Sequence, residues 1–82
     1  MTESNLEARL LAFVAGFEGL LPDEDVMNAR TLIAKREWGV GLELLCTQLV
    51  EYDVSLTDDE SAELKSLAQA MGLDVNDLGF AS

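Results

Sequence analysis

Apolar residues recur every three to four positions along most of this chain, which is the spacing of amphipathic α-helices. The first such segment predicts a helix from about Asn5 to Leu20, opened by a capping box of Ser4 and Glu7. Its predicted core face consists of Leu6, Leu10, Phe13, Val14, Phe17 and Leu21. Pro22 then ends the pattern, because proline disfavours helical conformation in the residue before it.

A second helix is predicted from Pro22 or Asp23 to Glu37. Its first turn is acidic and its last turn contains Lys35 and Arg36, so the charges complement the helix dipole at both ends. The acidic residues are Asp23, Glu24 and Asp25, and the core face consists of Val26, Ala29, Leu32 and Ile33 with Met27 at its edge. Helix electrostatics explains these charges, which therefore indicate no function by themselves.

Gly39 and Gly41 mark the start of a third predicted helix, which reaches about Tyr52. Its core stripe consists of Leu42, Leu45, Cys46 and Leu49, and Val50 widens it. In the connector that follows, Val54 and Leu56 are spaced to cover the core while the chain turns.

The fourth helix has the clearest local signal, because Thr57 and Glu60 form a capping box. Leu64, Leu67, Ala68 and Met71 are expected to face inward. Gly72 suits the left-handed residue that commonly ends a helix. Beyond it, Leu73, Val75, Leu78 and Phe80 could pack a tail onto the helices.

Together these segments predict an all-α fold, a compact bundle of four helices with a short C-terminal tail. Residues 1–82 should form one domain. The pairing and handedness of the helices do not follow from the pattern.

Charge narrows the range of partners, because sixteen acidic residues against five basic ones give a net charge of −11. Nucleic-acid binding requires the opposite sign, and an anionic membrane would repel this surface. The acidity either serves solvation or attracts a basic partner, and composition alone favours solvation. The N-terminus lacks the basic start of a secretory signal, and no apolar run approaches the roughly 20 residues of a membrane span. We therefore expect a cytoplasmic protein.

No catalytic or metal-binding pattern is present. The chain contains no histidine, and its one cysteine, Cys46, lies at an apolar helical position where burial is expected. A calcium loop beginning at Asp53 would require Gly and Glu where this chain has Asp58 and Leu64. We expect no catalytic residue, no metal and no cofactor, and hence a protein that is not an enzyme.

Two aromatic residues have alternative interpretations. Trp38, between the second and third helices, is either a structural anchor against the first and fourth helices or an exposed binding residue, and its area in so small a core favours the anchor. Tyr52, at a helix end between Glu51 and Asp53, is expected to be half exposed, and an interface role for it is equally possible.

The stretch from Glu37 to Leu73 resembles the MafI-type immunity proteins. The resemblance consists of Glu37-Trp38-Gly39, Leu42-Glu43-Leu44-Leu45, Gln48-Leu49, Glu51-Tyr52-Asp53, the capped link Ser55-Leu56-Thr57-Asp58-Asp59-Glu60, and Leu67, Ala68, Met71, Gly72 and Leu73. It implies a small helical antitoxin that binds the C-terminal domain of a polymorphic or contact-dependent inhibition toxin. Several such toxins are nucleases, including EndoU-type RNases, and a nuclease is basic where it binds RNA.

The resemblance does not identify contact residues, so these are predicted from exposure. The candidate partner-binding residues are Glu43, Gln48, Glu51, Tyr52, Asp53, Asp58 and Asp59. An alternative acidic ridge consists of Glu18, Asp23, Glu24 and Asp25. The alternative function is that of an acyl carrier protein, which is also small, acidic and four-helical. Its phosphopantetheine serine follows an aspartate directly, whereas Val54 separates Asp53 from Ser55 here.

Overall fold

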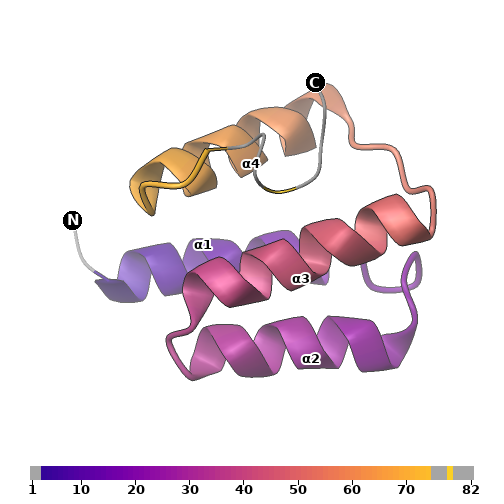
Figure 1. The fold of residues 1–82 in the computed structure, drawn as a ribbon, viewed down its shortest axis with the longest axis horizontal. Coiled ribbons are helices and arrows are strands. Elements are labelled where there is room, and N and C mark those ends of the chain that lie inside the picture. The colour runs from indigo at the N-terminus through magenta and orange to yellow at the C-terminus, as the bar shows by residue number, and fades with distance from the viewer. Residues whose placement is uncertain (1–2, 75–77, 79–82) are drawn as a thin grey trace.

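Four α-helices account for most of residues 3–74 and 78, the part of the chain that the computed structural model describes (Figure 1). They are α1 (Glu3–Ala15), α2 (Asp23–Ala34), α3 (Trp38–Glu51) and α4 (Asp58–Ala70). No strand occurs in the described residues. The predicted all-α bundle of four helices is confirmed.

The helices do not contribute equally to the bundle. α1, α2 and α3 each pack against the other two, whereas α4 approaches α1 only. Figure 1 shows α2 and α4 on opposite sides of the layer formed by α1 and α3. One side of α3 therefore has no helix against it.

The core forms where the apolar faces meet. Its buried residues from the helices and their links are Leu10, Phe13, Val14, Phe17, Leu21, Val26, Ala29, Ile33, Leu42, Leu45, Cys46, Leu49, Leu64, Leu67 and Ala68, joined by Leu78 from the tail. Leu6, Val54, Leu56, Met71 and Leu73 are partly buried against this core, and Leu32 is partly buried. The predicted core faces are thus largely confirmed, while Val75 and Phe80 lie outside the described residues.

The α1 boundaries differ from the prediction. The helix begins at Glu3, so Ser4 lies inside it rather than at its N-cap, and it ends at Ala15 instead of Leu20. The turn that follows keeps Phe17 and Leu21 buried, which is why the apolar spacing continues past the end of the helix. Gly19 takes a φ of 85° within that turn, a conformation that glycine adopts without a steric penalty.

The end of α2 also differs from the prediction. The helix ends at Ala34, so Lys35 is its C-cap and Arg36 lies beyond it, not in the last turn. Arg36 adopts the left-handed conformation with φ 65°. Its amide donates to the Ile33 carbonyl and the Glu37 amide donates to the Leu32 carbonyl, at 3.0 and 2.9 Å. These two bonds form a Schellman motif, which usually contains glycine at the left-handed position.

α4 has the predicted ends. The Thr57 hydroxyl accepts from the Glu60 amide at 3.1 Å, and the Glu60 carboxylate accepts from the Thr57 amide at 2.9 Å. Gly72 has a φ of 72° and closes a second Schellman motif with Leu73.

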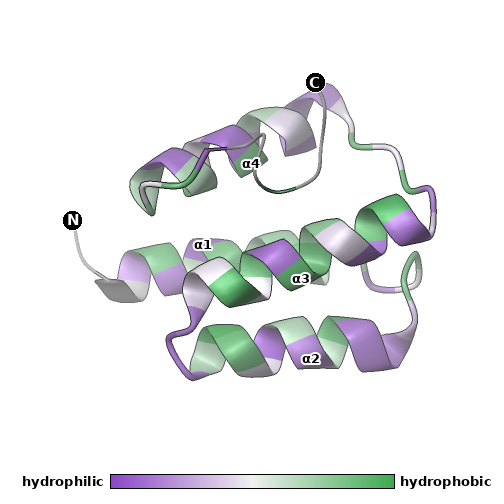
Figure 2. Ribbon diagram, viewed as in Figure 1, coloured by the Kyte–Doolittle hydropathy of each residue, from purple (hydrophilic) through white to green (hydrophobic). Residues whose placement is uncertain are grey.

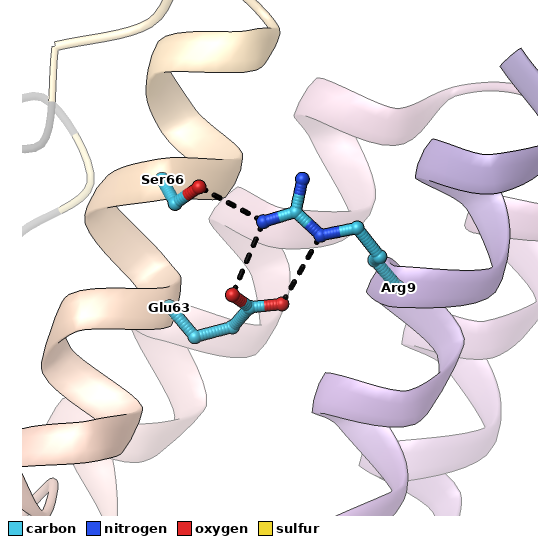
Figure 3. A network of polar contacts seen from close by, with 3 residues as sticks. All are labelled: Arg9, Glu63 and Ser66. Carbon is cyan, nitrogen blue, oxygen red and sulfur yellow. Dashed lines mark hydrogen bonds and ion pairs between the residues drawn. The ribbon is translucent and has the colours of Figure 1, made fainter. Parts of the chain in front are cut away.

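A polar cluster joins α4 to α1 (Figure 3). The Arg9 guanidinium donates to both carboxylate oxygens of Glu63, at 3.1 and 3.3 Å, and to the Ser66 hydroxyl at 2.9 Å. Both charged side chains are more than a third exposed, so the ion pair contributes only about 0.5–1 kcal/mol. Its bidentate geometry also fixes how α4 is oriented on α1.

Trp38 is the first residue of α3 and acts as the predicted anchor. Its side chain is partly buried against the core, and its indole N–H donates to the Ile33 carbonyl at 3.1 Å. It lines a small groove with Leu6 of α1 and Ala70 and Met71 at the end of α4, so it lies near the start of α1 and the end of α4. Through this hydrogen bond, Trp38 ties the start of α3 to the end of α2.

Candidate functional site

The outer side of α3 forms a continuous surface with apolar and acidic residues and no basic ones. Its exposed residues are Val40, Glu43, Thr47, Val50 and Glu51, which recur at helical spacing opposite the core stripe. Glu43 and Glu51 are the only charged residues in the helix. In Figure 2, hydrophobic green is prominent along α3, whereas α2 begins in a hydrophilic purple turn.

Six of the seven predicted contact residues are exposed. They are Glu43, Glu51, Tyr52, Asp53, Asp58 and Asp59. The Tyr52 side chain is half exposed, as expected, with 49% of its surface accessible.

Gln48 is the exception, because it is partly buried rather than turned to solvent. It lies seven positions after Gly41 and therefore on the same flank of the helix. That flank faces α2, since a Cβ built on Gly41 would lie 3.0 Å from Ile33 Cγ1. The packing of α3 on α2 thus explains why Gln48 is not fully exposed.

Val50 is more exposed than predicted, whereas Gln48 is less exposed. It was expected to widen the core stripe, but 51% of its surface is exposed. It lies about half a turn around the helix from Gly41, on the flank away from α2. α4 does not approach α3, so no helix covers this flank. Val40 is also 51% exposed, and the sequence offered no signal that distinguishes it from a core residue at the helix start.

The C-terminal end of α3 is held in place by a backbone motif. Asp53 has a left-handed φ of 59°. Its amide donates to the Val50 carbonyl at 3.1 Å, and the Val54 amide donates to the Leu49 carbonyl at 2.9 Å. Tyr52 and Asp53 are therefore displayed from an ordered turn, at the end of the molecule where the connector leads to α4 (Figure 1).

The structure separates the predicted contact residues into two groups, one at α3 and its C-terminal turn and one at the start of α4. Glu43 lies about 12 Å along the helix axis from Glu51, at the usual rise per residue. Asp58 and Asp59 occupy the first turn of α4, where their charges also stabilise the helix dipole. We call the residues Val40, Glu43, Thr47, Val50, Glu51, Tyr52 and Asp53 the α3 face. Asp58 and Asp59 lie beyond the connector on α4, which does not approach α3, and Asp59 lines a groove with Arg9 and Phe13 of α1.

The inner side of α3 contains the one cysteine of the chain. Cys46, on the inner side of the helix, is fully buried, and this burial raises the pKa of its thiol to about 12, with a further contribution from the Glu43 carboxylate. At neutral pH the thiol is therefore protonated, and a protonated thiol is a poor nucleophile. Among the described residues, no group of His, Cys, Asp and Glu side chains is arranged to hold a metal ion.

No family model, curated protein or solved structure matches this chain. In the described part of the chain, none of the helices has the length and apolarity needed to cross a membrane.

Proposed function

We propose that this protein is a cytoplasmic immunity protein that binds and neutralises a basic bacterial toxin domain. A nuclease is the leading candidate, and an EndoU-type RNase fits the resemblance best. The observation that carries the proposal is the α3 face, where Val40 and Val50 are half exposed beside Glu43 and Glu51. Such a surface suits a partner with basic residues around an apolar centre.

Charge and apolar contact would have different roles in this complex. The net charge of −11 would attract a basic domain over long range and speed its capture. Val40, Val50 and Tyr52 would supply the apolar area that slows dissociation, because tyrosine and apolar residues are typical of interface centres. By covering a basic substrate groove, the protein would block the toxin without any catalytic step.

The test is binding to the basic C-terminal domain of a toxin encoded beside this protein. Reversing Glu51, Asp53 and Asp59 to Lys should slow association about tenfold or more and reduce its salt dependence. The matched variant reverses Glu18, Asp23 and Glu24 on the alternative acidic ridge, which gives the same net charge. If the first variant binds like the parent protein, the α3 face is not the toxin interface. If only the second variant weakens binding, the alternative ridge is the toxin interface.

A carrier protein is the second candidate, because Ser55 is exposed in the connector just before the Thr57 N-cap. Incubation with coenzyme A and a phosphopantetheinyl transferase, followed by intact mass measurement, separates the two functions. The immunity proposal predicts an unchanged mass. A gain equal to the phosphopantetheine group, absent in a Ser55→Ala variant, would establish the carrier function instead.

A further inference from the structure

A second surface lies along the seam between α1 and α2. It is an open groove of about 630 Å³. Leu11 of α1 and Val26, Met27 and Ala34 of α2 provide its apolar lining, and Glu18, Asp23 and Arg30 are its charged residues. No residue of α3 or α4 lines it. Because α3 packs against both α1 and α2, this outer seam faces away from α3.

The sequence of α2 builds one wall of the groove. Asp23, Met27, Arg30 and Ala34 follow one another at steps of four, three and four residues and so form a single row on the helix. The core residues Ala29 and Ile33 lie on the neighbouring face, and Val26 lies where that face meets the groove. The row is therefore a lateral face of α2 that remains exposed to solvent when the helices pack.

Met27 is the main apolar feature of this row. It is 66% exposed, the largest value among the exposed large hydrophobic residues of the described chain. Methionine adapts its shape readily and is frequent at surfaces that accept varied apolar partners. Leu11 is partly buried beneath the opening, so an inserted apolar side chain would contact both residues.

The charge of the groove favours a positively charged partner. Arg30 is paired with Glu18 across the seam at 3.4 Å. Asp23 remains beside this pair, and Glu24 is exposed next to it at the start of α2. The local charge is negative, in keeping with the net charge of −11. A second copy of this chain would be repelled, whereas a basic segment would be attracted.

We propose that the α1–α2 groove is a docking site for an amphipathic basic helix of another protein. Its apolar side chains would insert between Leu11 and Met27, and its Lys or Arg side chains would reach Asp23 and Glu24. A helix suits a seam between two helices because ridges of side chains pack into such grooves. α2 extends for about 18 Å, which accommodates roughly three turns of the incoming helix. This inference does not depend on the proposed toxin binding.

The probe is a synthetic helical peptide of about 18 residues, long enough to be partly helical alone, with leucine on one face and lysine on the other. Its control has the same composition with the leucines scattered around the helix. Titration of isotope-labelled protein followed by NMR should shift the Met27 methyl signal and the amides of α1 and α2. Replacing Met27 with Ser should weaken the amphipathic peptide about tenfold, because Met27 would lose its buried apolar contact.

Val50→Ser is the matched variant, since Val50 is a similarly exposed apolar residue on the α3 face. It should leave the affinity for the peptide unchanged. Glu24→Gln should reduce the dependence of the affinity on salt. Equal binding of the scattered peptide, signal shifts centred on α3, or an equal loss in the Val50→Ser and Met27→Ser variants would each overturn the inference. Because the probe contains no toxin, these outcomes are independent of the toxin-binding test.

Discussion

Two non-glycine residues among those described, Arg36 and Asp53, adopt left-handed backbone conformation. In both cases the residue closes a helix through a Schellman motif. Side chains other than glycine are disfavoured there because Cβ crowds the following carbonyl oxygen. Aspartate tolerates the conformation better than arginine, yet at Asp53 its charge also lies near the negative end of the α3 dipole.

Replacing Asp53 with Gly should have opposite effects on the stability of the fold and on toxin binding. Stability should rise by about 0.5–1 kcal/mol, because both the backbone strain and the unfavourable dipole interaction are removed. Affinity for the basic toxin domain should fall, because a carboxylate of the proposed interface is lost. Denaturant unfolding and binding kinetics measure the two effects. The control is Gly72→Asp, which creates the same strain at the end of α4 and should destabilise the protein.

Burial of Cys46 should make the free energy of unfolding depend on pH in the alkaline range. Its thiol has a pKa of about 12 in the folded protein, above the ordinary value of 9.0, because burial disfavours the thiolate. Below pH 9 the thiol is protonated in both states, and its contribution to stability is fully present. Between pH 9 and about 12 only the unfolded state releases the proton, so stability should fall by roughly 1 kcal/mol per pH unit.

The measurement compares the protein with a Cys46→Ala variant by denaturant unfolding from pH 8 to 10.5. The variant is less stable at pH 8 because it leaves a small cavity, and this difference should shrink as the pH rises. All other ionisable groups are common to the two proteins, so their effects cancel in the comparison. A constant difference over this range would mean that the folded protein does not hold the thiol protonated.

At the scale of elements, two glycines at the start of α3 have different roles. A Cβ at Gly41 would lie 3.0 Å from Ile33 Cγ1 and 3.3 Å from the Ala29 carbonyl oxygen, so α2 and α3 approach closely there. Among the described residues, a Cβ at Gly39 would meet only Leu73 Cδ1, at an ordinary 3.7 Å. The spacing of the glycines does not reveal this difference, which arises from how α2 and α3 cross.

Gly41→Ala should therefore destabilise the protein by about 1–3 kcal/mol, although alanine is the better helix former. Gly39→Ala, its matched control, should be neutral or stabilise by up to about 1 kcal/mol. Thermal and denaturant unfolding measure both. Equal gains in stability would show that α2 and α3 have room to separate at this point.

Helix positions followed from the sequence better than helix ends did. Apolar periodicity located all four helices, and the Thr57 capping box and Gly72 marked the ends of α4. The end of α1 was misplaced because Phe17 stays in the core after the helix has ended. The end of α2 was misplaced because Arg36, which closes it, has no sequence signal comparable to glycine. Apolar spacing indicates which residues are buried. Because residues of a tight turn can also be buried, the spacing can continue past the end of a helix.

The candidate site was predictable only in part for a related reason. Periodicity places Glu43 and Glu51 on the outer side of α3, and both are exposed. The flanks of the helix depend on tertiary packing, since α2 partly covers Gln48 and no helix covers Val50. The exposure of Val40 and Val50 therefore emerged only from the structure, whereas that of Tyr52 was predicted.

At the scale of the whole molecule, the excess of acidic residues should make salt act in opposite directions on folding and on binding. With five basic residues against sixteen acidic ones, the folded chain repels itself, and added NaCl screens this repulsion. Raising NaCl from low to near-molar concentration should therefore increase Tm by several degrees, since about 1 kcal/mol corresponds to roughly 4–8 °C for a domain of this size. The same salt should slow association with a basic partner, because it screens the attraction.

Calorimetry and binding kinetics in one salt series measure both effects. A variant with Glu24 and Glu37 changed to Lys serves as the control, since its lower net charge should reduce the gain in Tm. Neither side chain belongs to the α3 face, so a change in its toxin dissociation rate would indicate a larger interface than proposed. A Tm that does not respond to NaCl would show that the carboxylates are too dispersed for self-repulsion to affect folding. An association rate that does not respond would show that the acidic surface does not steer the partner, leaving Val40, Val50 and Tyr52 to account for recognition.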